Sequence, residues 1–415
     1  MRQISLSILL LTTLLLSCDT SSNVDPIFEV YFTKYYGDDG EQEGVDIVAN
    51  TDGSMILLGN SFSQSNPISP FIVKTDAGGN VLWQREFKNN NETAVDIELI
   101  NGGNQLAILS NVQRTTTNIC IYILGQDGNL VDSLYITSVK NQVGKSIVQS
   151  SDGGFLITGS KDPNPDRNPD LPPPDQADIL LLKVNNAMDI ISDLSPGGGE
   201  HIGSGVKAFE IGLNSEIYYL VFGHSDRPRK QTTDYQLCFQ LLAANTDGVP
   251  TGMHEVSENE INEEQNASSV LKIPPALGDG YLVVGTTSLG GSSNLYLTRF
   301  SKPLNPNAAT KSLDRKIPLS RNIEGVSAAN ASPDGYFVVG NEVRENNKRD
   351  IFLMRVERDG APTWNTSFGS LEGEDTAGGV EALPDGRIAV VGTIQLETQK
   401  KIALIVTNGN GRFSD

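Results

Sequence analysis

A repeated unit of about 50 residues constrains this chain more than any other feature of its sequence. Each copy contains an apolar strand, a turn that often holds Asp-Gly, and a second strand that ends in glycine. The clearest copies are VDIVANTDGSMILLGNS (45–61), KSIVQSSDGGFLITGS (145–160), ASSVLKIPPALGDGYLVVGTT (267–287), GVSAANASPDGYFVVGN (325–341) and GGVEALPDGRIAVVGT (378–393). Weaker copies at 94–111 and 206–224 fill the gaps. A period of about 50 residues with short strands is typical of the blades of a β-propeller.

The repeats also predict how the ring closes. Each of the seven copies is followed by a third strand, but the chain ends at Asp415, before the seventh copy has a fourth. The segment at 27–48 aligns with 362–383, so residues 28–36 are expected to supply the missing strand. We therefore predict an all-β fold: one seven-bladed β-propeller of four-stranded blades over residues 28–415, closed by the N-terminal strand pairing with the last blade.

The N-terminus has the layout of an export signal. A single positive charge precedes an apolar run, residues 4–16, that is shorter than the ~20 residues of a membrane-spanning helix. Leu15-Leu16-Ser17-Cys18 resembles the lipobox of bacterial lipoproteins. The resemblance implies that residues 1–17 are a removable signal peptide, that Cys18 is lipidated, and that residues 18–27 are a tether to the membrane. An ordinary cleaved signal with an incidental cysteine is the alternative.

From about residue 27 to residue 413, the repeats resemble the DG-repeat β-propellers of lipoproteins and secreted proteins of Bacteroidota, and more loosely kelch and delta-60 repeats. This resemblance implies export and a lipid-anchored place at the outer membrane, on either the cell surface or the periplasmic side. It does not select an activity, because propellers serve both as enzymes and as binding platforms.

Acidic residues are concentrated in the loops expected on one face. In a propeller, the loops from each fourth strand to the next first strand, and from second to third strands, share a face, here called the top face. The candidate binding residues on these loops are Asp38, Asp39, Glu41, Glu43, Glu92, Glu200, Glu324, Glu372, Glu374 and Asp375, together with Glu258, Glu260, Glu263 and Glu264. We expect either a ring that binds a cation or a basic partner, or a solvated surface.

Two insertions belong to the same face, at 161–178 and 224–234. The first is rich in proline, and the second holds the basic candidates Arg227, Arg229 and Lys230. Long loops on a rigid scaffold often carry binding residues, so these are candidate contact sites, with simple decoration as the alternative.

Several function classes are disfavoured. The 51 acidic and 31 basic residues give a net charge of −20, which opposes nucleic-acid binding. The sequence lacks the G-x-S-x-G, Walker A, H-E-x-x-H and dinucleotide-binding motifs. No metal or cofactor is expected, because the EF-hand-like start at Asp162 lacks the later glycine and glutamate, and the three histidines have no second close ligand beside them.

Two recurring residue types are expected to be structural. Trp83 and Trp364 occupy the same position in their fourth strands, which favours packing between blades over ligand stacking. Basic residues recur at the ends of third strands, where we expect hydrogen bonds or ion pairs within the scaffold: Lys74, Lys183, Arg299 and Arg355.

The sequence thus predicts a non-catalytic, lipid-anchored module of the bacterial envelope that binds a protein or a ligand, within an outer-membrane assembly. The expected partners are the membrane, through the anchor, and an envelope protein or a glycan. The alternative is a carbohydrate-active hydrolase or lyase, or a glycan-binding lectin, that uses the top face. Unevenly distributed acids around a deep channel pocket would favour the enzyme.

Overall fold

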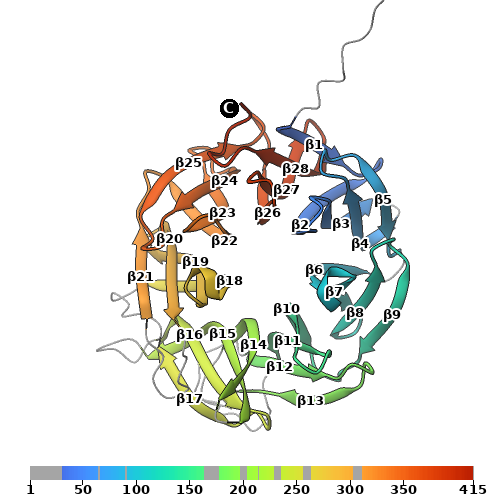
Figure 1. The fold of residues 1–415 in the computed structure, drawn as a ribbon, viewed down its shortest axis with the longest axis vertical. Coiled ribbons are helices and arrows are strands. Elements are labelled where there is room, and N and C mark those ends of the chain that lie inside the picture. The colour runs from blue at the N-terminus through green and yellow to red at the C-terminus, as the bar shows by residue number, and fades with distance from the viewer. Residues whose placement is uncertain are drawn as a thin grey trace, which may run out of the picture. The chain divides into compact units, whose positions relative to one another are not determined.

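Seven antiparallel sheets of four strands each surround a central axis in the computed structural model (Figure 1). The structure describes residues 30–414 except 64–65, 89–90, 163–176, 197–202, 214, 229–234, 256–262 and 302–310. In six sheets the strands lie in chain order from the axis outward, and in the seventh β1 takes the outermost place after β26, β27 and β28 (Figure 1). The prediction of a seven-bladed propeller with four-stranded blades is confirmed.

The first four blades are continuous in sequence. Blade 1 holds β2 (Glu41–Ala49), β3 (Met55–Ser63), β4 (Asn66–Thr75) and β5 (Val81–Glu86). Blade 2 holds β6 (Glu92–Ile100), β7 (Gln105–Gln113), β8 (Thr117–Gly125) and β9 (Leu130–Ile136). Blade 3 holds β10 (Gln142–Gln149), β11 (Phe155–Lys161), β12 (Asp178–Val184) and β13 (Ile190–Leu194). Blade 4 holds β14 (Gly203–Leu213), β15 (Glu216–Pro228), β16 (Tyr235–Asn245) and β17 (Pro250–Glu255).

The last three blades include the closure. Blade 5 holds β18 (Glu264–Ile273), β19 (Gly280–Leu289), β20 (Ser292–Ser301) and β21 (Lys311–Ile317). Blade 6 holds β22 (Asn322–Asn330), β23 (Tyr336–Val343), β24 (Arg349–Val356) and β25 (Pro362–Phe368). Blade 7 holds β26 (Thr376–Ala382), β27 (Ile388–Leu396) and β28 (Gln399–Thr407), with β1 (Phe32–Tyr36) as its outer strand.

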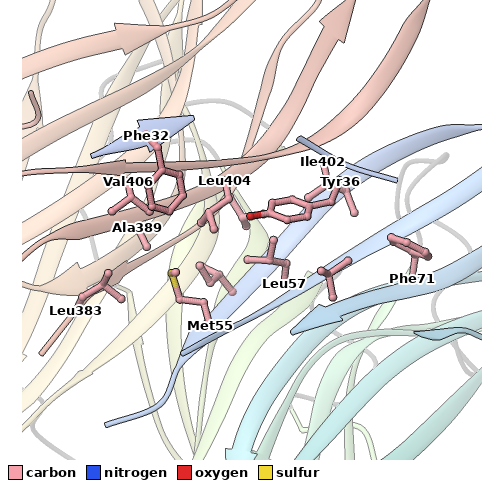
Figure 2. Close-up of a cluster of buried hydrophobic side chains, with 13 residues drawn as sticks. Phe32, Tyr36, Met55, Leu57, Phe71, Leu383, Ala389, Ile402, Leu404 and Val406 are labelled. Atoms are coloured by element: carbon pink, nitrogen blue, oxygen red, sulfur yellow. The ribbon is translucent and has the colours of Figure 1, made fainter. Parts of the chain in front are cut away.

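Strand β1 closes the ring as predicted, from within the predicted segment 28–36. It pairs antiparallel with β28, in a register that places Phe32 opposite Val406 and Tyr36 opposite Ile402. Phe32 and Tyr36 belong to a buried cluster that also contains Met55 of blade 1 (Figure 2). The Tyr36 hydroxyl donates a hydrogen bond of 2.8 Å to the carbonyl oxygen of Gly79 in blade 1. The closing strand therefore joins the last blade to the first.

A glycine within the second strand of six blades marks a close approach of two strands. A Cβ atom added to Gly159 would lie 1.9 Å from the carbonyl oxygen of Val143 on the neighbouring strand β10. Five other blades have glycine at the equivalent position, and blade 2 has Ser110. These glycines let the innermost hairpin pack closely beside the axis.

Replacing Gly159 with alanine should therefore destabilise the protein. We expect the free energy of unfolding to fall by about 2 kcal/mol, because the new methyl group must displace backbone atoms. Gly212, in β14, is the control, since a Cβ atom there would have no other atom within 4 Å. Urea unfolding of both variants measures the difference, and similar losses would argue against the close-approach explanation.

The two tryptophans pack between blades, as expected. Trp83 lies against a buried cluster drawn from blades 1 and 2, and Trp364 against one drawn from blades 6 and 7. The Trp83 indole Nε1 donates to the carbonyl oxygen of Gln126 in blade 2, at 3.0 Å.

The recurring basic residues are structural as well. Lys74 donates to the carbonyl oxygen of Gln126 in the next blade, at 3.0 Å. Lys183 forms an ion pair of 2.7 Å with Asp152 in its own blade. The other two, Arg299 and Arg355, donate to backbone carbonyl oxygens of the first turn in their own blades. Lys183, Arg299 and Arg355 thus fix turns that join first and second strands, whereas Lys74 fixes the turn between β8 and β9 of the next blade.

Candidate functional site: the central channel

A bulge in every innermost strand sets which side chains line the channel. In each blade the pairing of first and second strands shifts register at the same place, between Gly44 and Asp46 in blade 1, for example. The residue after the bulge differs from blade to blade, in order Asp46, Asp96, Ser146, Lys207, Ser269, Ser327 and Gly379. A regular backbone thus carries an irregular set of side chains at one level of the channel.

A cavity of about 570 Å³ lies inside this ring of strands, and all seven innermost strands contribute to its lining. Its lining residues run from the bulge to the far ends of these strands, such as Gln149 and Lys272. A second cavity of about 510 Å³ shares these two residues and continues to the turn residues Ser150 and Ser151. The channel cavity therefore extends toward the face opposite the top face, here called the bottom face.

Charge is distributed unevenly around the cavity. Carboxyl groups come from blades 1, 2 and 7, and are Asp46, Asp96, Glu98 and Glu381. Ammonium groups come from blades 3, 4 and 5, and are Lys145, Lys207 and Lys272. Blade 6 contributes only Val326, Ser327 and Ala328 to the lining. One side of the channel is acidic and the other is basic.

Asp46 and Asp96 form a carboxyl pair. A hydrogen bond joins their side chains, and burial followed by the nearby charge of Asp96 raises the pKa of Asp46 well above its usual range. Asp96 accepts a hydrogen bond of 2.7 Å from the backbone N–H of Ile147 in the next blade. The raised pKa means that Asp46 holds its proton more tightly than an ordinary aspartic acid.

Lys207 lies among the four carboxyl groups. Burial lowers the pKa of its ammonium, but the charges of Asp96, Glu98 and the two remaining acids outweigh burial and raise it overall. Burial raises the pKa of Glu98 to about 7, against the opposing charge of Lys207. Burial likewise raises the pKa of Glu381 to about 7, against Lys207. Lys207 is therefore charged, whereas these two glutamates change protonation near neutral pH.

Two buried polar atoms of the cavity have no hydrogen-bond partner. They are the hydroxyl oxygen of Ser146, a residue only 4% exposed, and Oε2 of Glu98. Buried polar atoms in proteins are nearly always hydrogen-bonded, to protein groups, ordered water or a ligand. Ser146 and Glu98 therefore mark where a polar ligand can be held.

Most top-face candidates are at the surface. Asp38, Asp39 and Glu372 are exposed, and Glu41 and Glu43 are half-buried. The remaining half-buried members are Glu324 and Glu374. Contacts confirm that the two loop classes share a face, since Arg344 of a second-to-third loop donates to the carbonyl oxygens of Ser370 and Leu371 in a fourth-to-first loop, each at 3.0 Å.

Three of the predicted top-face residues require correction, because they are buried. Glu263, only 6% exposed, accepts a hydrogen bond of 2.5 Å from the Thr287 hydroxyl and forms an ion pair of 3.0 Å with Lys316. The other two are fully buried. Glu92 accepts hydrogen bonds from Ser110 and from the hydroxyl of Tyr122, the latter at 2.9 Å. Asp375 accepts from the hydroxyl of Ser370 at 2.9 Å. Both fill a position at the start of the first strand where other blades have buried glutamine. They hold the scaffold together and are not surface binding residues.

Basic residues neutralise part of the acidic ring. Arg349 forms ion pairs with Glu324 at 3.0 Å and Glu374 at 2.8 Å. Lys400 forms an ion pair of 3.0 Å with Glu43.

Several candidates lie outside the described residues, namely Cys18, Glu200, Glu258, Glu260, Arg229 and Lys230, and Arg227 lies in β15 with its side chain outside them. Within the described residues, no group of three or more His, Cys, Asp or Glu side chains is placed to hold a metal ion.

Sequence reasoning missed the channel site. Its signal is present in the aligned repeats, where the position two residues after Gly44, Ala94 and Gly144 reads Asp, Asp and Ser. The residue at this position differs from repeat to repeat, whereas the apolar residues around it recur. This difference distinguishes the position from the core around it.

The comparisons with known proteins support the fold. No family model and no curated protein matches the chain. Kuenenia stuttgartiensis hydrazine synthase has a TM-score of 0.54 and 9% identity, covering 89% of this chain and 97% of that one. A protein of unknown function from Dyadobacter fermentans has a TM-score of 0.48 and 10% identity, covering 90% and 97%. An oligogalacturonate lyase in complex with manganese has a TM-score of 0.49 and 14% identity, covering 92% and 97%.

The seven four-stranded sheets define the class of protein as a seven-bladed β-propeller, and the similarity to the hydrazine synthase agrees with this fold. The fold alone does not select an activity, because unrelated functions occur on the same fold. Among the described residues, no helix is long and apolar enough to cross a membrane.

Proposed function

We propose that this chain is a lipid-anchored binding propeller of the bacterial envelope and that its ligand occupies the central channel. The observation that carries the proposal is the cavity of about 570 Å³ in which Ser146 and Glu98 keep buried polar atoms without partners. Ligand pockets typically measure about 300–1,000 Å³ and combine apolar walls with a few polar groups. An unpaired buried polar atom costs about 1–3 kcal/mol, which a hydrogen-bonding ligand would recover.

The proposed anchor lies in the N-terminal segment. The lipobox-like sequence ends at Cys18, and β1 begins at Phe32. Because the loop from β1 to β2 is on the top face, β1 starts at the bottom face. A lipid on Cys18 would then hold the protein at the outer membrane, where an envelope protein is the further expected partner.

Binding can be tested by thermal unfolding of the lipidated protein in detergent, with a library of amino acids, short peptides, sugars, sugar acids and amines. Ser268 is exposed and lines the channel, so Ser268→Trp should obstruct the cavity without disturbing the core. Ser292→Trp, at an exposed position at the start of β20, is the control. We expect at least one compound to raise the Tm of the wild type and the control but not of Ser268→Trp. Absence of any such compound would refute the proposal.

A hydrolase or lyase is a second candidate, favoured by the Asp46–Asp96 pair. Two carboxyl groups in one cavity with different protonation states can act as general acid and base. The uneven distribution of acids fits this candidate, although the cavity extends toward the bottom face and not to the expected top mouth. Mass spectrometry of each stabilising compound after incubation tests it. Consumption of a compound by the wild type but not by Asp96→Asn would support an enzyme. If the wild type leaves every compound unchanged, the enzyme candidate is rejected and the binding function remains.

A further inference from the structure

The acidic side of the channel has more carboxyl groups than positive charges to neutralise them. Four carboxyl groups from three blades surround the single ammonium of Lys207. The raised pKa values of Asp46, Glu98 and Glu381 mean that protons supply part of the missing positive charge. A ligand ammonium placed there would replace those protons and pair with the ionised carboxylates.

The basic side carries two exposed ammonium groups. Lys145 and Lys272 come from the blades on either side of the blade of Lys207, and both line the cavity. Among the described residues, no carboxylate lies within ion-pairing distance of Lys145 or Lys272. A ligand carboxylate would find its counter-charge there.

The unpartnered atoms lie between these two sides along the ring. Glu98 is in blade 2 and Ser146 is in blade 3, where the acidic arc of the ring meets the basic one. A ligand that crosses the cavity can donate a hydrogen bond to Glu98 Oε2 and exchange one with the Ser146 hydroxyl.

We propose that the channel binds a small zwitterion, the size of a short peptide, with its amine toward blades 1, 2 and 7 and its carboxylate toward blades 3 and 5. This inference rests on the proposed binding function. The charge division accounts for both ends of the ligand, and the volume of about 570 Å³ accommodates several residues. A polyamine would leave Lys145 and Lys272 without a counter-charge. A simple anion would be repelled by the carboxyl groups of blades 1, 2 and 7.

Three peptides of nearly equal size test the ligand class by isothermal titration calorimetry on the lipidated protein. They are trialanine, N-acetyl-trialanine, which lacks the amine, and trialanine amide, which lacks the carboxylate. We expect trialanine to bind at least about tenfold more tightly than either capped peptide, since each cap removes a charge-assisted contact. Equal affinities for all three would overturn the inference.

Matched variants locate the two ends of the ligand. Glu98→Gln should weaken binding of trialanine about tenfold and have little effect on N-acetyl-trialanine. Lys272→Met should weaken trialanine binding and have little effect on trialanine amide. Glu357→Gln and Lys88→Met, at exposed positions outside the cavity, are the controls. If both channel variants weaken all three peptides equally, the proposed orientation is wrong.

The affinity of trialanine should also rise with pH between 5.5 and 7.5. The charged and titratable groups that face the site are Asp46, Asp96, Glu98, Lys145, Lys207, Lys272 and Glu381. Glu98 and Glu381, each with a pKa of about 7, become ionised across this interval and gain attraction for the amine. Calorimetry in two buffers of different ionisation enthalpy should show proton release on binding, and proton uptake would contradict the model.

The outcomes separate this inference from the proposed function. If no peptide binds, but another library compound stabilises the wild type and not Ser268→Trp, the zwitterion class is wrong and the binding function stands. If neither the peptides nor the library yields a ligand, both proposals fail.

Discussion

Replacing both Phe32 and Tyr36 with alanine should open the ring and lower the free energy of unfolding by about 5 kcal/mol or more. Both side chains are buried in the cluster that joins blades 7 and 1 (Figure 2). The Phe32 ring also lies against Gly79, where an added Cβ atom would approach within 2.6 Å. The double variant therefore loses apolar contacts and the hydrogen bond from Tyr36 to blade 1 together. Urea unfolding, followed by circular dichroism, measures the loss.

A neighbouring residue provides the control for this experiment. Tyr35 is in the same strand and is 45% exposed, so Tyr35→Ala should cost less than about 1 kcal/mol. Tyr36→Phe should cost about 1 kcal/mol, because it removes only the hydrogen bond. If Tyr35→Ala destabilised the protein as much as the double variant, closure would depend on backbone pairing and not on the buried side chains.

The sequence predicts the propeller well because each blade repeats the same local pattern. Blades 2 and 4 lack the Asp-Gly turn, but other residues make their first hairpins. In blade 2, Asn101, Gly102 and Gly103 all have positive φ, and in blade 4 Ser215 has a φ of 67°. Different turn residues thus provide the same chain reversal, which is why the weaker copies still form blades.

The candidate sites are harder to predict, because burial depends on contacts with distant strands. Glu92 and Asp375 look like the exposed acids of neighbouring loops, yet partners such as Ser110 hold them inside the scaffold. The channel site combines Asp46 with Lys207, residues that are far apart in the sequence. Only the closed ring brings these charges together.

Replacing Lys207 with methionine should destabilise the protein strongly at pH 8 and only weakly at pH 5. The pKa values of Glu98 and Glu381 are raised from a usual value of 4.5 to about 7. The folded state holds the protons of Glu98 and Glu381 more tightly than the unfolded state does. The stability that this protonation adds is therefore complete below about pH 4.5 and is lost as the pH rises through 7. Lys207 limits that loss, because its positive charge attracts the ionised forms. Without it, we expect a loss of about 3 kcal/mol at pH 8, at the upper end of the usual range for a single substitution.

Lys272→Met is the matched control for this prediction, because Lys272 is an exposed lysine of the same cavity. Its loss should be below about 1 kcal/mol at both pH values, as expected for a charge that remains in contact with water. Urea unfolding of the two variants and the wild type at pH 5 and pH 8 gives the comparison. At pH 5 the glutamates of the channel are largely protonated, so the ammonium of Lys207 has less charge to balance. Equal losses for Lys207→Met at both pH values would mean that Lys207 stabilises the ring by packing of its aliphatic chain and not by its charge.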